Sequence, residues 1–208
     1  MPSNAVPTER RQRADGARSR QAILKAATEL ATSEGLDGLS IARLADHVGM
    51  SKSGLFAHFR SKEELQIATI DAAAELWDRE VWQPGMTAPP GMARVLNQCE
   101  AFFSYLERGV LQGGCFFVAA AAELDAKPGP VRDHFLSVYT SLIHNFAAVI
   151  AEAQQLGEIR ATEDVAQLTF ELDAFLLGAN FAFVFFADPV SLDRARLAVR
   201  RRLELARA

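Results

Sequence analysis

A short polar stretch, Ser51–Gly54, is the part of this 208-residue chain that is best equipped to bind another molecule. Its serine hydroxyls and lysine ammonium can hydrogen-bond to phosphate oxygens or to the edges of bases. Its glycine lets a partner approach the backbone closely. Because the stretch follows Gly49 directly, we expect it to open a helix and to present its polar side chains outward.

The residues on either side predict two short helices with a tight turn between them. Ser40 stands at an N-cap position and Gly49 supplies a stop, so the first helix has about two turns. Its apolar residues share one face: Ile41, Leu44, Ala45 and Val48. Ser51 can cap the second helix. The inward anchors of that helix are expected to be Leu55, Phe56 and Phe59.

Further helices flank this pair. An apolar face at helical spacing follows Arg18 and ends at Gly35, which predicts a helix upstream. Downstream, Ser61–Glu64 has the pattern of a capping box and starts a fourth helix that runs to about Trp82. The proline- and glycine-rich stretch 84–91 then predicts a loop and a domain boundary.

Charge is distributed unevenly along the chain. The net charge is −4, but residues 1–62 hold ten Lys and Arg against six acidic residues, so this part carries +4 and the remainder carries −8. Only the N-terminal part suits a polyanionic partner.

Two short helices with an outward polar N-terminal face form a helix-turn-helix, in which one helix enters the major groove of a DNA duplex. Lys52 and Ser53 can contact base edges or phosphates, and Ser51 and Lys62 lie at helix N-termini that favour phosphate. Arg43 can be a phosphate ligand or a plain surface charge, and His58 a packing ring or a phosphate ligand. The candidate DNA-binding residues are Arg43, Ser51, Lys52, Ser53, Gly54, Ala57, His58 and Lys62.

The segment LSIARLADHVGMSKSGLFAHFRSKEEL, Leu39–Leu65, resembles the DNA-binding region of the tetracycline-repressor-type (TetR/AcrR) bacterial transcription regulators. Strong similarity covers residues 18–66, and Gly113–Asp133 resembles a recurrent variant of the family's larger domain. The resemblance implies a homodimer that pairs through its last two helices, a double-stranded DNA operator and a small-molecule effector. It also implies phosphate contacts from positions 56 and 62, although Phe56 stands where tyrosine is frequent and lacks the hydroxyl for such a bond.

The rest of the chain predicts long helices and no strands, so the fold class is all-α. The helices are expected near 91–108, 114–125, 129–156, 162–186 and 189–206, with Thr162 and Asp188 as caps. We divide the chain into a flexible basic arm or plain unstructured leader (residues 1–17), a head that holds the helix-turn-helix (residues 18–66), and a ligand-binding and dimerisation body (residues 67–208).

The body is rich in aromatic residues, which suits both a core and an apolar ligand pocket. Each polar candidate for that pocket is more often a buried residue with its hydrogen bonds satisfied than a ligand contact. The candidate pocket residues are Phe102, Phe103, Phe116, Phe117, His144, Asn145, Asp173 and Asn180. Cys115 at a helix start is a small buried side chain or, alternatively, a redox-sensing thiol.

Other classes of function find little support. No catalytic motif, metal-ligand spacing or phosphate-binding glycine loop is present, so we expect no enzyme, no cofactor and no metal. The apolar run Ala174–Ala187 is too short to span a bilayer, and the chain lacks a signal sequence, so a soluble cytoplasmic protein is expected. The competing hypothesis is a helical ligand-binding or dimerisation protein without DNA function.

Overall fold

The structure, a computed structural model, describes the backbone of residues 6–208 and the side chains of residues 15–208. Its regular elements over that range are helices, which confirms the all-α class. In chain order they are α1 (Val6–Glu34), α2 (Ile41–Val48), α3 (Lys52–Phe56), α4 (Lys62–Trp77), the π-helix η1 (Asp78–Trp82), α5 (Gln83–Gly85), α6 (Met92–Glu107), α7 (Phe116–Leu124), α8 (Pro130–Gln155), α9 (Val165–Phe185) and α10 (Val190–Ala206).

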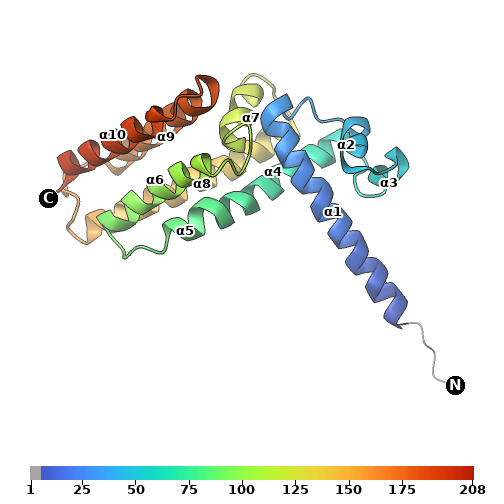
Figure 1. Ribbon diagram of the computed structural model, residues 1–208. Helices are drawn as coiled ribbons and strands as arrows, with labels where there is room; N and C mark the ends of the chain where they lie inside the picture. Colours follow the sequence, from blue (N-terminus) through green and yellow to red (C-terminus); the bar gives the residue numbers. More distant parts are fainter. Residues whose placement is uncertain (1–5) are drawn as a thin grey trace.

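The head is built around α1, with α2 and α3 packed together on its flank and α4 leading from them into the body (Figure 1). The predicted caps are present: the Ser40 Oγ accepts from the Arg43 N–H at 3.2 Å, and Gly49 ends α2 at a φ of +68°. Seven fully buried apolar side chains form the core of the head: Ile23, Leu36, Leu39, Leu44, Leu55, Phe59 and Leu65. These caps and this core hold α3 in place.

Two expectations for the head are wrong. The prediction of a flexible arm or unstructured leader is wrong over residues 6–17, because α1 begins at Val6 and continues to Glu34. Pro7 falls in its first turn, where a missing N–H costs no intrahelical hydrogen bond, and residues 1–5 lie outside the described part. Phe56 is not an inward anchor, because its side chain is 53% exposed. Leu55 and Phe59, four residues apart, share the inner face of this single turn, and Phe56 points about 100° away from it.

The helical segment that starts at Lys62 is longer than the sequence predicts, since it continues past Trp82 to Gly85. α4 passes through η1 into α5 without leaving helical backbone, so the predicted loop starts only at Met86 and ends at Gly91. The later helices lie close to their predicted ranges. Thr162 is not the cap of α9: Asp164 accepts from the Ala166 N–H at 2.9 Å, because α9 starts at Val165.

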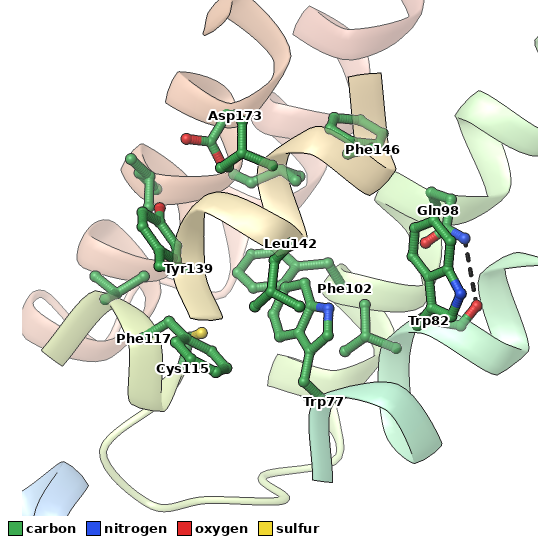
Figure 2. A pocket seen from close by; sticks show the side chains of 15 residues that line it. Trp77, Trp82, Gln98, Phe102, Cys115, Phe117, Tyr139, Leu142, Phe146 and Asp173 are labelled. Carbon is green, nitrogen blue, oxygen red and sulfur yellow. Dashed lines mark hydrogen bonds between the residues drawn. The ribbon is translucent and has the colours of Figure 1, made fainter. Parts of the chain in front are cut away.

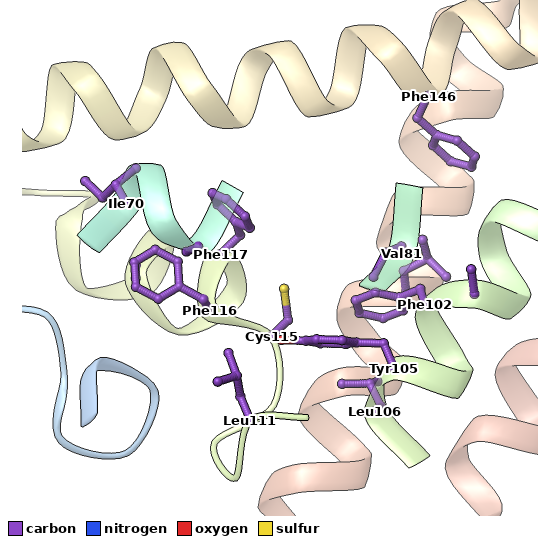
Figure 3. Packing of buried hydrophobic residues seen from close by; sticks show 14 of the residues in the cluster. Ile70, Val81, Phe102, Tyr105, Leu106, Leu111, Cys115, Phe116, Phe117 and Phe146 are labelled. Carbon is purple, nitrogen blue, oxygen red and sulfur yellow. The ribbon is translucent and has the colours of Figure 1, made fainter. Parts of the chain in front are cut away.

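The body packs α4, α6, α8 and α9 around an aromatic and aliphatic core, to which α7 adds Phe116 and Phe117 (Figure 3). α9 and α10 pack against each other at the face remote from α1 (Figure 1). By length and composition alone, α8 and α9 could each cross a membrane, a test that core helices of soluble proteins also pass. Here α8 packs on α4, α6 and α9 along one side, and its other side is exposed.

Candidate DNA-contacting surface and ligand pocket

The N-terminal end of α3 presents the outward polar face that the sequence predicts. The Ser51 Oγ accepts from the Gly54 N–H at 3.1 Å and lies 3.2 Å from the Ser53 Oγ. Lys52, Ser53 and Ala57 are exposed, and the buried Leu55 anchors the turn from below. The arrangement presents one ammonium and the Ser51–Ser53 hydroxyl pair to solvent at the helix N-terminus, where the exposed N–H groups favour anionic oxygens.

Lys62 lies at the start of α4, where Ser61 caps the helix by accepting from the Glu64 N–H at 3.0 Å. The capping box closes one residue earlier than predicted, because the Glu64 carboxylate accepts from the Arg60 N–H at 2.9 Å. The exposed Lys62 Nζ donates to the Asp37 carbonyl at 2.7 Å. An ammonium has three donors, so Lys62 can brace the turn before α2 and still meet a phosphate.

Arg43 and His58 lie beside α3 with contacts of their own. Arg43 pairs with Glu34 at 2.8 Å, and the Arg43 side chain is well exposed, so the pair is weak and can be exchanged for a phosphate. The His58 ring is half-buried, with its centroid 6.4 Å from that of Phe59 at a tilted angle. The Arg20 guanidinium lies over the Phe59 ring, 4.9 Å from its centroid.

A cavity of about 50 Å³ lies inside the body, between α4–η1, α6, α7, α8 and α9 (Figure 2). We call it the aromatic pocket. It is lined by Trp77, Val81, Trp82, Gln98, Phe102, Cys115, Phe117, Val118, Tyr139, Leu142, Ile143, Phe146, Asp173, Leu176 and Leu177.

Three of the eight predicted pocket residues line this cavity: Phe102, Phe117 and Asp173. Phe103 and Phe116 are buried in the surrounding core. His144 and Asn145 are exposed on α8 and face away from it. Asn180 is buried but has a structural partner, since its Oδ1 accepts from the Cys115 N–H at 2.8 Å.

Most of the wall was not predicted from the sequence, above all Trp77 and Trp82. Trp77 and Trp82 lie on α4 and η1, which sequence spacing assigned only to a connecting helix. Their five-residue separation puts both on the pocket only because the π-helix widens each turn. No pattern in the sequence indicated that π-helix.

Burial controls the ionisation of the groups around the pocket. It raises the pKa of Asp173 to about 6, from an ordinary value of 3.8. It also raises the pKa of the Tyr139 hydroxyl, and that of the Cys115 thiol to about 11. Cys115 is therefore a neutral thiol near pH 7, which speaks against the redox-sensor alternative.

The head and the body each match a known protein family. Residues 23–69 match the family described as bacterial regulatory proteins of the tetR family. Residues 91–199 match the tetracyclin repressor-like C-terminal domain. The chain belongs to the TetR family. It is thus a DNA-binding transcriptional regulator and not an enzyme.

Individual relatives of this TetR-family regulator agree in fold and class. The transcriptional regulator AcuR of Cereibacter sphaeroides is 23% identical over 167 residues, which cover 79% of this chain and 74% of AcuR. The transcriptional activator FasR of Mycolicibacterium smegmatis is 32% identical over 85 residues, or 41% of this chain and 39% of FasR. A TetR regulator from Chloroflexus aurantiacus superimposes with a TM-score of 0.84 at 24% identity, covering 91% of this chain and 96% of its own.

In this TetR-family regulator, α7 connects the aromatic pocket to the head. Cys115 and Phe117 at its start line the pocket, and Glu123 near its end accepts from the N–H groups of Leu36 and Asp37 at 2.6 and 2.7 Å. Lys127 pairs with Asp37 at 2.6 Å and reinforces the contact. Together these bonds clamp the turn between α1 and α2 to the body, and we call them the Glu123 clamp.

A glycine allows the close packing beside the Glu123 clamp. Gly113 lies against the last turn of α1, where an added Cβ would come to 2.0 Å from the Thr32 carbonyl oxygen. Any larger residue at position 113 would push the segment before α7 away from α1.

Proposed function

We propose that this regulator is a homodimeric repressor in the cytoplasm, and that a small apolar or amphipathic molecule releases it from its DNA operator. The observation that carries the proposal is the combination of an exposed α3 face in the basic N-terminal part of the chain, residues 1–62, with an aromatic pocket in the body. The two lie on elements that are directly connected by α4.

The DNA contacts fall into two kinds. Lys52, Ser53, Gly54 and Ala57 are on the face that would enter the major groove and contact base edges. Ser51, Lys62, Arg43 and His58 surround that face and would contact phosphates, which fix register without carrying sequence information. In a dimer, two copies of α3 would meet half-sites about 34–36 Å apart.

The proposal of a homodimer is supported by exposed apolar side chains on α9, α10 and the segment between them. Monomeric proteins rarely expose large apolar patches of this kind. The exposed residues are Phe170, Phe181, Val184, Phe185, Phe186, Val190, Leu197 and Leu205. Phe181, Phe185 and Phe186 also contact one another, with ring centroids 5.0 to 5.6 Å apart, and so form one continuous surface that a second copy would cover.

The position of α4 supports release by a ligand. Its first turns hold Leu65 in the core of the head, and Trp77 at its end lines the aromatic pocket. A cavity of about 50 Å³ is smaller than most ligand sites, so a bound effector would push the Trp77 and Trp82 rings outward. Because α4 is a continuous helix, that displacement would change the angle of the head, provided that the ligand prefers one arrangement.

The test is DNA binding by the full-length protein to the DNA that flanks its own gene, measured by mobility shift across a salt series. We expect affinity to fall steeply as salt rises, because phosphate-bound counterions are released on binding. Lys62→Ala should weaken binding to all sequences about equally and flatten the salt dependence. Lys52→Ala should instead change which sequences are preferred.

Two outcomes would contradict the proposal. If Lys52→Ala left sequence preference unchanged, the base-reading role of α3 would be wrong. If every molecule that binds the body left operator affinity unchanged, release by an effector would be refuted. Because Lys62 also donates to the Asp37 carbonyl, the helix content and thermal unfolding of Lys62→Ala must match those of the wild type for its result to count.

A further inference from the structure

The aromatic pocket contains one charge that the protein does not balance. Among its fifteen lining residues, Asp173 alone is ionisable as an acid in the neutral pH range. Within residues 15–208, Asp173 has no ion-pair or side-chain hydrogen-bond partner; its side chain is half-buried in the pocket wall, and desolvation raises its pKa. Partial removal of a carboxylate from water costs free energy, which a ligand of opposite charge can offset.

The rest of the wall is suited to a positive charge. Six aromatic rings line the cavity: Trp77, Trp82, Phe102, Phe117, Tyr139 and Phe146. Four of them pack against one another, whereas Trp82 and Phe146 have no aromatic partner among the described side chains. Ring faces attract cations, and tryptophan does so most strongly.

The one amide in the wall points to the same conclusion. Gln98 donates its amide nitrogen to the Trp82 carbonyl at 3.3 Å, which fixes the amide and leaves its oxygen as an acceptor (Figure 2). Asp173 and this oxygen are both acceptors, and the wall contains no lysine, arginine or histidine. An anionic ligand would find no cationic side chain here and would be repelled by Asp173.

We infer that the aromatic pocket binds an organic cation, an ammonium head with apolar substituents, with Asp173 as its counter-charge and the Trp82 and Phe146 rings beside it. The inference rests on the proposed function in taking this cavity as the effector site, and it narrows the effector from any apolar or amphipathic molecule to a cationic one. Because the cavity is only about 50 Å³, binding of such a cation requires the surrounding rings to separate.

Calorimetric titration of the full-length protein at about pH 7.5 tests this with probes matched in size. The cations are tetramethylammonium and 3,3-dimethylbutylammonium, and the neutral probe is 3,3-dimethylbutan-1-ol, which has the shape of the second cation. We expect both cations to bind and the alcohol to bind at least about tenfold more weakly than its cationic counterpart.

Two variants locate the effect. Asp173→Asn should remove the preference for the cation over the alcohol, because it keeps the shape of the side chain and removes its charge. Trp82→Leu should weaken the cations about threefold and the alcohol less, through loss of the cation–π contact. Asp133→Asn is the control: Asp133 is an exposed carboxylate on α8 outside the pocket, so removing its charge should change neither affinity.

The result that overturns the inference is equal binding of the alcohol and its cationic counterpart, no cation binding at millimolar concentration, or an unchanged preference in a folded Asp173→Asn protein. Operator binding is measured separately, so the two proposals can fail separately. Cation binding that leaves DNA affinity unchanged would refute release and keep the inference. Release from the operator by neutral or anionic molecules alone would support the proposed release and refute the inference of a cationic ligand.

Discussion

The head and the body of this protein use polar side chains in opposite ways. In the head, Ser40, Ser51 and Ser61 each cap a helix that starts near the surface, and Lys52 stays in water until a partner arrives. In the body, Asp173 is half-buried in an aromatic wall, where desolvation raises its pKa.

The difference follows from the two kinds of partner. A duplex is a polyanion that is met in solvent, so exposed donors on a rigid turn suffice, and their contribution is screened by salt. A small ligand must be taken out of water, so the pocket needs apolar surface and few polar groups, each of which carries a large desolvation cost. A substitution in the head should therefore act mainly by disordering α3 or by changing its exposed DNA-contacting side chains. A substitution in the pocket should act mainly by changing the charge of the wall.

The largest effect is expected from breaking the support of the head. Leu55→Ala removes a fully buried side chain below α3 and should destabilise the head by about 2–5 kcal/mol, with loss of operator binding. Leu156→Ala is a matched control, because Leu156 is 56% exposed and its loss should cost less than about 0.5 kcal/mol. Thermal unfolding and limited proteolysis of residues 18–66 provide the measurement. An intact head in Leu55→Ala would contradict the packing described for α3.

The next largest effect should come from the Glu123 clamp, where head and body meet. Glu123→Gln replaces a carboxylate that accepts two backbone N–H groups with an amide that can accept only through its single oxygen. We expect a loss of about 2 kcal/mol in stability and faster amide exchange at Leu36 and Asp37. The control Glu204→Gln changes an exposed carboxylate whose partner is Arg207, and it should have little effect. Unchanged exchange at the two amides would rule out the Glu123 clamp.

A smaller effect, and of opposite sign, is expected in the pocket. Asp173 has a pKa of about 6 when folded against 3.8 ordinarily, so its favourable contribution to folding is fully present below 3.8 and is lost as pH rises through about 6. Asp173→Asn should therefore raise stability at neutral pH, by about 1 kcal/mol or a melting temperature higher by about 2–4 °C, and the gain should vanish near pH 4.

The groups around Asp173 do not interfere with that comparison. Cys99, Cys115 and Tyr139 all feel its charge, and burial raises the pKa of each, so none ionises between pH 4 and 7. Thermal unfolding of the two proteins across this range is the measurement. If the stability gained by Asp173→Asn did not depend on pH, the two side chains would differ in packing and not in charge.

Sequence predicted the two regions unequally for a physical reason. Caps, stops and the α3 face depend on residues within a few positions of each other, so Ser40, Gly49 and Ser51 were predicted where they lie. The pocket wall joins Trp77 to Leu177 through tertiary packing, which local spacing does not encode. Asp173 was predicted to be a pocket residue because it is a polar residue in an apolar helix. His144 has the same signature but lies on the exposed side of α8, because helical spacing alone does not say which face is buried.

The smallest predicted effect concerns Phe56, whose ring is 53% exposed beside the α3 face. If this ring lies against the DNA backbone, Phe56→Tyr adds a hydroxyl that can donate to a phosphate at no cost to the core. Operator affinity should then rise about 2- to 10-fold, the value of one hydrogen bond of about 0.5–1.5 kcal/mol, with the same sequence preference. Leu136→Met, a change on the exposed side of α8, should leave affinity unaltered. A change in preference in the Phe56→Tyr protein would mean that position 56 faces the bases. No change in affinity would place it clear of the backbone, and the head would then approach the duplex at a different angle around α3.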